Sequence, residues 1–69
     1  MPKFIYTPID MREKMLALGY KELTFCNIKN EKYVIFDNIN TNRSNVNFSV
    51  NFSVEETKKI IFTSKLYFV

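Results

Sequence analysis

The spacing of apolar residues along the chain changes from helical to strand-like and back. An apolar stripe first recurs at the helical spacing i, i+4 and i+7: Met11, Met15 and Leu18. Thr7 is suited to capping a helix, proline fits the first helical position, and Gly19 falls where a helix ends in a left-handed residue. The pattern therefore predicts a helix over Pro8–Leu18, preceded by a short strand over Lys3–Tyr6.

After Gly19 the pattern becomes that of strands. Tyr20–Ile28 is rich in strand formers, and a polar break of hairpin length follows over Lys29–Lys32. Tyr33–Phe36 is apolar at every position, which is typical of a strand that lies inside a sheet or is covered on both faces. We expect these two strands to form an antiparallel hairpin.

A short tandem repeat follows the hairpin and a polar loop. Val46–Ser49 reads Val-Asn-Phe-Ser, and Val50–Ser53 repeats it. On a helix the two valines would lie opposite the two phenylalanines and leave no single apolar face, whereas on a strand all four side chains share one face. The repeat therefore predicts a strand over residues 46–52 with its Val and Phe side chains buried.

The C-terminal part begins with a helix signal. Ser53 and Glu56 have the spacing of a capping box, so a helix is predicted to begin at Val54. A stripe at helical spacing continues to Phe68, although the last residues are also rich in strand formers. We favour the longer helix, and an end near Thr63 followed by a strand stays open.

These elements predict a single α+β domain spanning residues 1–69, in which an antiparallel sheet of three to four strands has two helices packed on one face. A chain of 69 residues makes one domain and buries only about 60% of its unfolded surface, which leaves a thin core. Hydrophobic residues make up 46% of the chain, which is a globular and not a disordered composition.

The composition argues against several kinds of chemistry. The chain has no histidine, the commonest general base and metal ligand near neutral pH, and one cysteine, Cys26. One thiol forms no internal disulfide and no multi-cysteine zinc site, and one glycine is too few for a phosphate-binding loop. We therefore expect a non-enzyme without a cofactor or bound transition metal, located in a reducing cytoplasm, with Cys26 buried as a small hydrophobic residue.

Charge and aromatic content bear on the class of partner. Aromatic residues make up 16% of the chain and are enriched at protein interfaces, so a small accessory protein that binds or inhibits another protein is the favoured function. A homodimer formed through an exposed sheet edge stays open. No apolar run reaches the roughly 20 residues of a membrane-spanning helix, so we expect no membrane partner.

The alternative is a nucleic-acid-binding module. The net charge is +3, and a helix, three strands and a second helix follow one another in double-stranded-RNA-binding domains. Those domains carry lysines at the start of the last helix, where this chain has Glu55 and Glu56, which repel phosphate. Nucleic acid is therefore not the favoured partner.

The segment Met11–Tyr20 has the sequence Met-Arg-x-x-Met-Leu-x-x-Gly-Tyr and precedes the predicted hairpin and second helix. In this arrangement the chain resembles small uncharacterised proteins of low-GC Gram-positive bacteria and their phages. In those proteins a strand leads to a helix ending in Gly-aromatic, then to two strands and a short helix. The resemblance covers residues 4–36 and 53–61, implies no known activity and supplies no functional residues. The abundance of Asn, Lys, Ile and Phe suits an AT-rich genome and supports a phage or mobile-element source.

The candidate contact surface is near the C-terminus. If the second helix runs to Phe68, three apolar residues spaced i, i+4 and i+7 form an exposed patch with lysines at its rim, which is typical of a protein contact. If the chain instead becomes a strand after Thr63, the same residues join the core. The polar loop over Asp37–Asn45 adds an arginine, because loops often carry function. The predicted contact residues are Phe62, Leu66, Val69, Lys58, Lys65 and Arg43.

Overall fold

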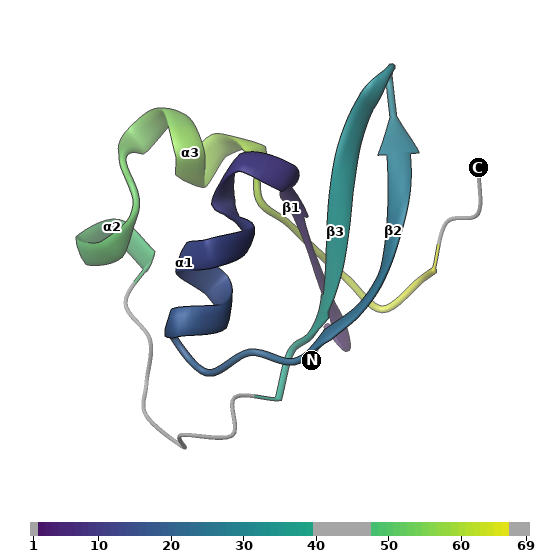
Figure 1. Cartoon of the computed structure of the whole chain (residues 1–69), viewed down its shortest axis with the longest axis horizontal. Coiled ribbons are helices and arrows are strands. Elements are labelled where there is room, and N and C mark those ends of the chain that lie inside the picture. Colours follow the sequence, from purple (N-terminus) through teal and green to yellow (C-terminus); the bar gives the residue numbers. More distant parts are fainter. Residues whose placement is uncertain (1, 40–47, 67–69) are drawn as a thin grey trace.

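The computed structural model of the chain describes residues 2–39 and 48–66, which form a four-stranded antiparallel sheet with helices against one face (Figure 1). The strands are β1 (Phe4–Pro8), β2 (Glu22–Ile28), β3 (Glu31–Asp37) and β4 (Ile61–Thr63), in the spatial order β2-β3-β1-β4. The helices are α1 (Arg12–Ala17), which follows a 3₁₀ turn (Ile9–Met11), α2 (Phe48–Asn51) and α3 (Val54–Lys59). The predicted α+β class is confirmed.

β3 lies inside the sheet, as its apolar sequence predicts. It pairs with β1 on one side and with β2 on the other, and all four residues of Tyr33–Phe36 are buried. Val34 and Phe36 belong to the core beneath the helices, whereas Tyr33 and Ile35 belong to a second cluster on the opposite face. Burial on both faces explains why this strand is apolar at every position.

The predicted hairpin is also confirmed, with a tighter turn. Ile28 pairs with Glu31 across a two-residue turn made by Lys29 and Asn30. Both turn residues have positive φ, 49° and 68°, as a type I′ turn requires. β2 therefore ends at Ile28, as predicted, whereas β3 begins at Glu31, two residues earlier than the polar break indicates.

The first helix follows the predicted stripe. Met11 and Met15 are buried, and Leu18 packs against the same core. Gly19 has a φ of 97°, a left-handed conformation that favours glycine, so the predicted end of the helix is confirmed.

The predicted cap at Thr7 is wrong. Thr7 belongs to β1, where it pairs with Val34, and its buried Oγ1 has no hydrogen-bond partner among the residues that the structure describes. Pairing with β3 holds residues 4–8 extended, so the chain turns helical only after Pro8, whose ψ of 150° is that of a strand. An unsatisfied buried hydroxyl costs about 1–3 kcal/mol, so the strand forms at the expense of this group.

The predicted strand over residues 46–52 is wrong where the structure describes it. Phe48–Asn51 forms α2, and the Phe52 N–H donates to the Phe48 carbonyl oxygen at 2.8 Å. Phe48 and Phe52 lie one turn apart and pack on the core, whereas Val50 is 77% exposed. A helix this short needs only one pair of apolar side chains on the core and not a continuous apolar face. Exposing Val50 costs less free energy than exposing either phenylalanine would, because valine has the smaller apolar surface. Val46 lies outside the described residues.

The predicted capping box at the start of α3 is confirmed. The Glu56 N–H donates to Ser53 Oγ at 3.1 Å, and the Ser53 N–H donates to the Glu56 carboxylate at 2.9 Å. The Lys14 ammonium donates to the same carboxylate at 3.2 Å and so connects α1 to α3.

We expect the Glu56→Gln substitution to weaken the pH dependence of stability. The backbone N–H of Ser53, followed by the Lys14 ammonium, lowers the pKa of the Glu56 carboxyl. A lowered pKa contributes stability above the unfolded-state pKa, and this contribution is lost as the pH falls through the folded-state value. Thermal unfolding from about pH 5 down to about pH 3 should therefore show a smaller loss in Glu56→Gln than in the wild type. Glu55→Gln is the matched control, and an equal effect of both substitutions would contradict the expectation.

The predicted long second helix is wrong. α3 ends at Lys59, and Ile61–Thr63 forms β4, so the alternative with a C-terminal strand is closer to the structure. Ile61 pairs with Tyr6, which gives β1 a second neighbour in the sheet. Strand pairing prevails because Ile-Ile-Phe-Thr is rich in strand formers and satisfies the backbone groups of a free strand edge. Phe68 lies outside the described residues.

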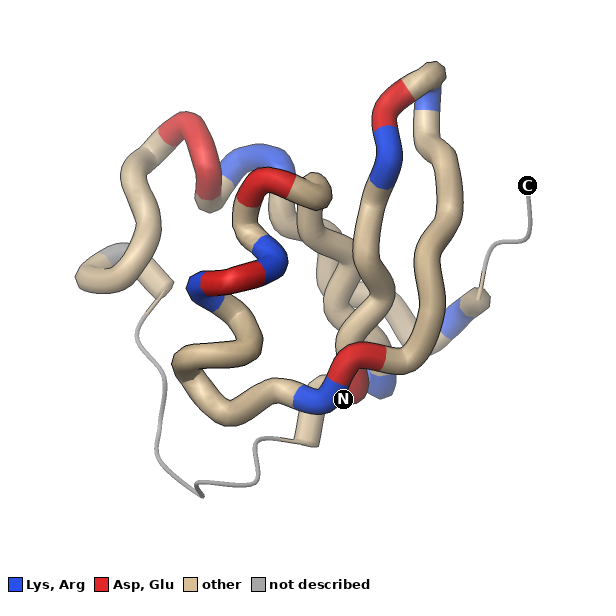
Figure 2. Tube along the Cα trace, in the orientation of Figure 1, with Lys and Arg blue, Asp and Glu red and all other residues tan. Residues whose placement is uncertain are grey.

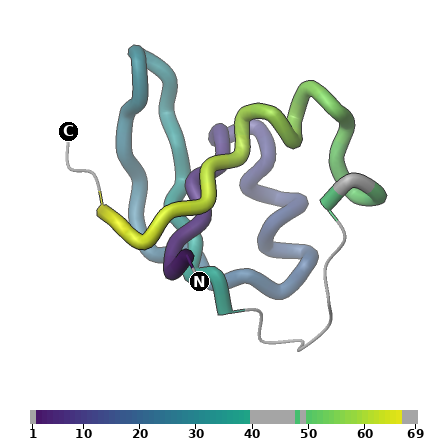
Figure 3. Tube along the Cα trace, turned by 180° about the vertical axis from the view of Figure 1, so that it is seen from behind, coloured from purple at the N-terminus to yellow at the C-terminus, as the bar shows by residue number. Residues whose placement is uncertain are grey.

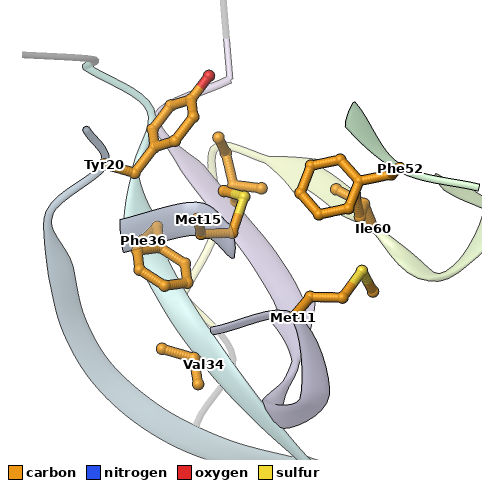
Figure 4. Close-up of a cluster of buried hydrophobic side chains, with 8 residues drawn as sticks. Met11, Met15, Tyr20, Val34, Phe36, Phe52 and Ile60 are labelled. Atoms are coloured by element: carbon orange, nitrogen blue, oxygen red, sulfur yellow. The ribbon is translucent and has the colours of Figure 1, made fainter. Parts of the chain in front are cut away.

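The main core lies between the sheet and the helices. Figure 4 shows Met11 and Met15 lying between the β3 side chains and the pair Phe52 and Ile60. Its buried members are Ile5, Met11, Met15, Tyr20, Val34, Phe36, Phe52 and Ile60. The chain thus joins residues far apart in sequence into one small core.

Candidate functional site

The structure places Phe62 on the helix side of the sheet. Phe62 pairs with Ile5 in the β4–β1 ladder, and its ring lies edge-on to Phe48 at a centroid distance of 5.4 Å. Phe48 also contacts Phe52 at 5.3 Å and Tyr20 at 6.0 Å, so it is the centre of an aromatic cluster. Phe62 is still 47% exposed, but one side of its ring already packs against α2.

The residues after β4 lie on the other side of the sheet. The Tyr6 hydroxyl, which belongs to the cluster facing away from the helices, donates to the Lys65 carbonyl oxygen at 3.1 Å. Figure 3 shows β4 beside β1 and the chain after β4 continuing past β1 toward the side of the hairpin. Phe62 and Leu66 therefore do not share the patch that a helix would have given them, although Leu66 is 40% exposed.

The other predicted contact residues do not complete this patch. Lys58 is an exposed residue of α3 whose ammonium lies 4.0 Å from the Glu55 carboxylate. Arg43 and Val69 lie outside the described residues.

A surface that the sequence analysis did not single out lies along β2. Within the described residues β2 pairs with β3 alone, so it is an edge strand of seven residues. Leu23, near the start of the strand, is 42% exposed, and Phe25, at its centre, is 43% exposed. The available signal was the sequence of Tyr20–Ile28, which is less apolar than its partner strand and so fits an edge better than an interior position.

The outer backbone groups of β2 follow from the hairpin geometry. Residues flanking a two-residue turn exchange both backbone hydrogen bonds, so Ile28 and Glu31 form a hydrogen-bonded pair. Such pairs alternate along an antiparallel ladder. The N–H and C=O groups of Phe25 and Asn27 therefore point away from β3, toward the open edge.

Phe25 lies on the helix side of the sheet but beyond the helices. It pairs with Val34, which is part of the main core, yet Figure 1 shows the hairpin extending away from the helical layer. The only charged group over its ring is the Lys32 ammonium, at 5.0 Å from the centroid, among the described residues. The ring is therefore held in place by its own hairpin and remains accessible.

The base of β2 is fixed to α1. Arg12 Nε donates to the Glu22 carboxylate, and both side chains are partly buried. A register shift between Glu22 and Thr24 marks a bulge at Leu23. The ion pair and the bulge together position the start of β2. The ion pair also neutralises the charge of Glu22.

Cys26 is the only thiol, and it faces away from Phe25. It pairs with Tyr33 and packs against the cluster on the far side of the sheet, partly buried. Burial raises the pKa of the Cys26 thiol, which keeps it protonated and poorly nucleophilic. Among the residues that the structure describes, no three acidic or cysteine side chains gather as a metal site would require.

Comparisons with protein-family models, with curated protein sequences and with solved structures give no match. None of the helices in the described part of the chain has the length and apolar character needed to cross a bilayer.

Proposed function

We propose that this chain is a non-catalytic protein that binds another protein through the outer edge of β2. One observation carries the proposal: a seven-residue edge strand presents two large apolar side chains, each more than 40% exposed, beside outward backbone groups. Natural sheets usually shorten, charge or cover their edges, because an open edge pairs with other chains. Inhibition of the bound protein is one consequence that such binding can have.

Nucleic acid is the less well supported partner. Two of the basic side chains, Arg12 and Lys14, are engaged by the carboxylates of Glu22 and Glu56. Figure 2 shows acidic and basic positions interspersed over the helices and the hairpin, without a continuous basic stripe in the described part. The described order also differs from helix, three strands, helix, because the predicted third strand contains a helix.

The proposal includes a cytoplasmic location and a phage or mobile-element origin. A single cysteine supports a reducing compartment, since small secreted domains usually carry disulfides. The composition rich in Asn, Lys, Ile and Phe supports the origin.

Site-specific photo-crosslinking in cells of the natural source tests the binding surface. A photoreactive amino acid in place of Phe25 should give an adduct of discrete mass with one other protein. The same substitution at Val54, which is 72% exposed on α3, is the matched control and should give none. Substitution at Leu66 tests the C-terminal surface. An adduct from Leu66 but not from Phe25, or equal adducts from all three positions, would refute the β2 surface.

A further inference from the structure

We infer that the partner segment is an extended, acidic peptide that adds to β2 as a fifth strand of the sheet. The inference rests on the proposed function and specifies the chemistry of its partner. It follows from two independent features of β2, the direction of its backbone groups and the sign of the charges around it.

The backbone requires an extended partner. Phe25 and Asn27 each direct one N–H and one C=O to the open side, with a spacing of two residues. Only another extended chain presents donors and acceptors at this spacing, as in strand addition to a sheet edge. Alternate side chains of the added strand would then lie on the face that carries Phe25, whose ring offers an apolar contact.

The charges around β2 favour acidic residues in that partner. Lys21 precedes the strand, Lys29 follows it, and Lys32 lies over Phe25, and none of the three makes an ion pair within the described residues. Figure 2 shows basic positions at both ends of the hairpin, with acidic positions beside them. Arg12 neutralises Glu22, so the remaining carboxylates of the hairpin are Glu31 at its tip and Asp37, whose N–H donates to the Lys21 carbonyl oxygen at its base. The three lysines outnumber these two carboxylates, so the hairpin has a net positive charge.

The same charges disfavour a second copy of this chain. An antiparallel pairing of two β2 strands centred on Phe25 would place Lys21 of one copy opposite Lys29 of the other, at both ends of the interface. Like charges directly opposite one another destabilise a strand pair. An acidic peptide in the same position would place opposite charges beside both lysines.

Titration with two synthetic peptides, followed by amide NMR shifts of the full chain, tests the inference. The probe is acetylated and amidated Glu-Glu-Thr-Val-Thr-Val-Thr-Glu-Glu, and the matched peptide has Lys in place of every Glu. We expect the acidic peptide to shift the amides of Phe25 and Asn27 and to bind at least about tenfold more tightly at low salt, with a difference that shrinks as salt is added.

A pair of substitutions at one position isolates the backbone contribution. Asn27→Pro removes one outward N–H and leaves the β2–β3 hydrogen bonds intact, a position where an edge strand tolerates proline. Asn27→Ala removes the same side chain and keeps the N–H. We expect the proline variant to bind the acidic peptide at least about tenfold more weakly and the alanine variant to bind it within about twofold of the wild type. Circular dichroism and melting confirm that both variants are folded.

The outcomes separate this inference from the proposed function. Equal binding of the two peptides, binding of neither, or equal loss in the two folded Asn27 variants would overturn the acidic fifth strand. So would concentration-dependent dimerisation through β2 without peptide, because the occupant would then be a second copy. If neither peptide binds but crosslinking at Phe25 still captures one protein, the proposed binding surface is supported. The inferred acidic, extended partner segment is then refuted.

Discussion

Phe52→Ala is expected to lower the free energy of unfolding by about 3–5 kcal/mol, the range for truncating a buried phenylalanine. Phe52 is 4% exposed and packs with Phe48 and the residues of the main core. It follows α2 directly, so its removal leaves a cavity between α2, α3 and the sheet. Chemical denaturation followed by circular dichroism measures the loss.

Val50→Ala is the control for this substitution. Val50 is 77% exposed on the other side of α2, and its truncation should change the free energy of unfolding by no more than about 0.5 kcal/mol. A strand would place both side chains on one face, so comparable losses for the two variants would show that the segment is not helical.

Met15→Ala should cost about 2–5 kcal/mol, as large-to-small substitutions of buried methionine do. Met15 is fully buried at the centre of the core, between the β3 side chains and Phe52 (Figure 4). The cavity would have no neighbouring layer able to fill it, because a chain of this size has a single thin core beneath its helices.

Leu16→Ala, one residue along α1, gives the comparison. Leu16 is 37% exposed, so its truncation should cost about 1 kcal/mol or less in the same denaturation experiment. An equal loss at the two positions would mean that α1 presents a different face to the sheet.

The elements that could be predicted from sequence are those with a local signal. Met11 and Met15 recur at helical spacing, Gly19 provides a left-handed end, and Ser53 with Glu56 forms a capping box. Each of these signals acts within a few residues, through side-chain spacing or the backbone of one turn. The apolar run of β3 was informative for a similar reason, because burial on both faces leaves no polar position in the strand.

The errors occur where tertiary pairing decides. Residues 46–52 alternate apolar and polar side chains as a strand does. Phe48 and Phe52 nevertheless both pack on the core because they lie one helical turn apart. Ile61 continues a helical stripe, but β1 needs a neighbour along its free edge and Ile61 supplies one. The local sequence pattern carries no information about which distant core or strand edge a segment will pack against.

The candidate site was missed for a related reason. The apolar patch built on Phe62 and Leu66 depended on a continuous helix, whereas the chain forms β4 at Phe62 and reaches the Tyr6 hydroxyl, on the face away from the helices, at Lys65. The importance of Phe25 depends on the order of strands, which makes β2 an edge strand. A sequence without aligned relatives states which residues are apolar but not which strand has a free side.

Amide hydrogen exchange along β2, measured in dilute solution without a partner, tests the open edge most directly. The amides of Thr24, Cys26 and Ile28 point toward β3 and should exchange roughly a hundredfold or more slowly than unfolded chain, whereas those of Phe25 and Asn27 should exchange within about tenfold of it. Equal protection of all five amides in the dilute chain would show that the outer edge is already paired, and would contradict a binding surface on β2.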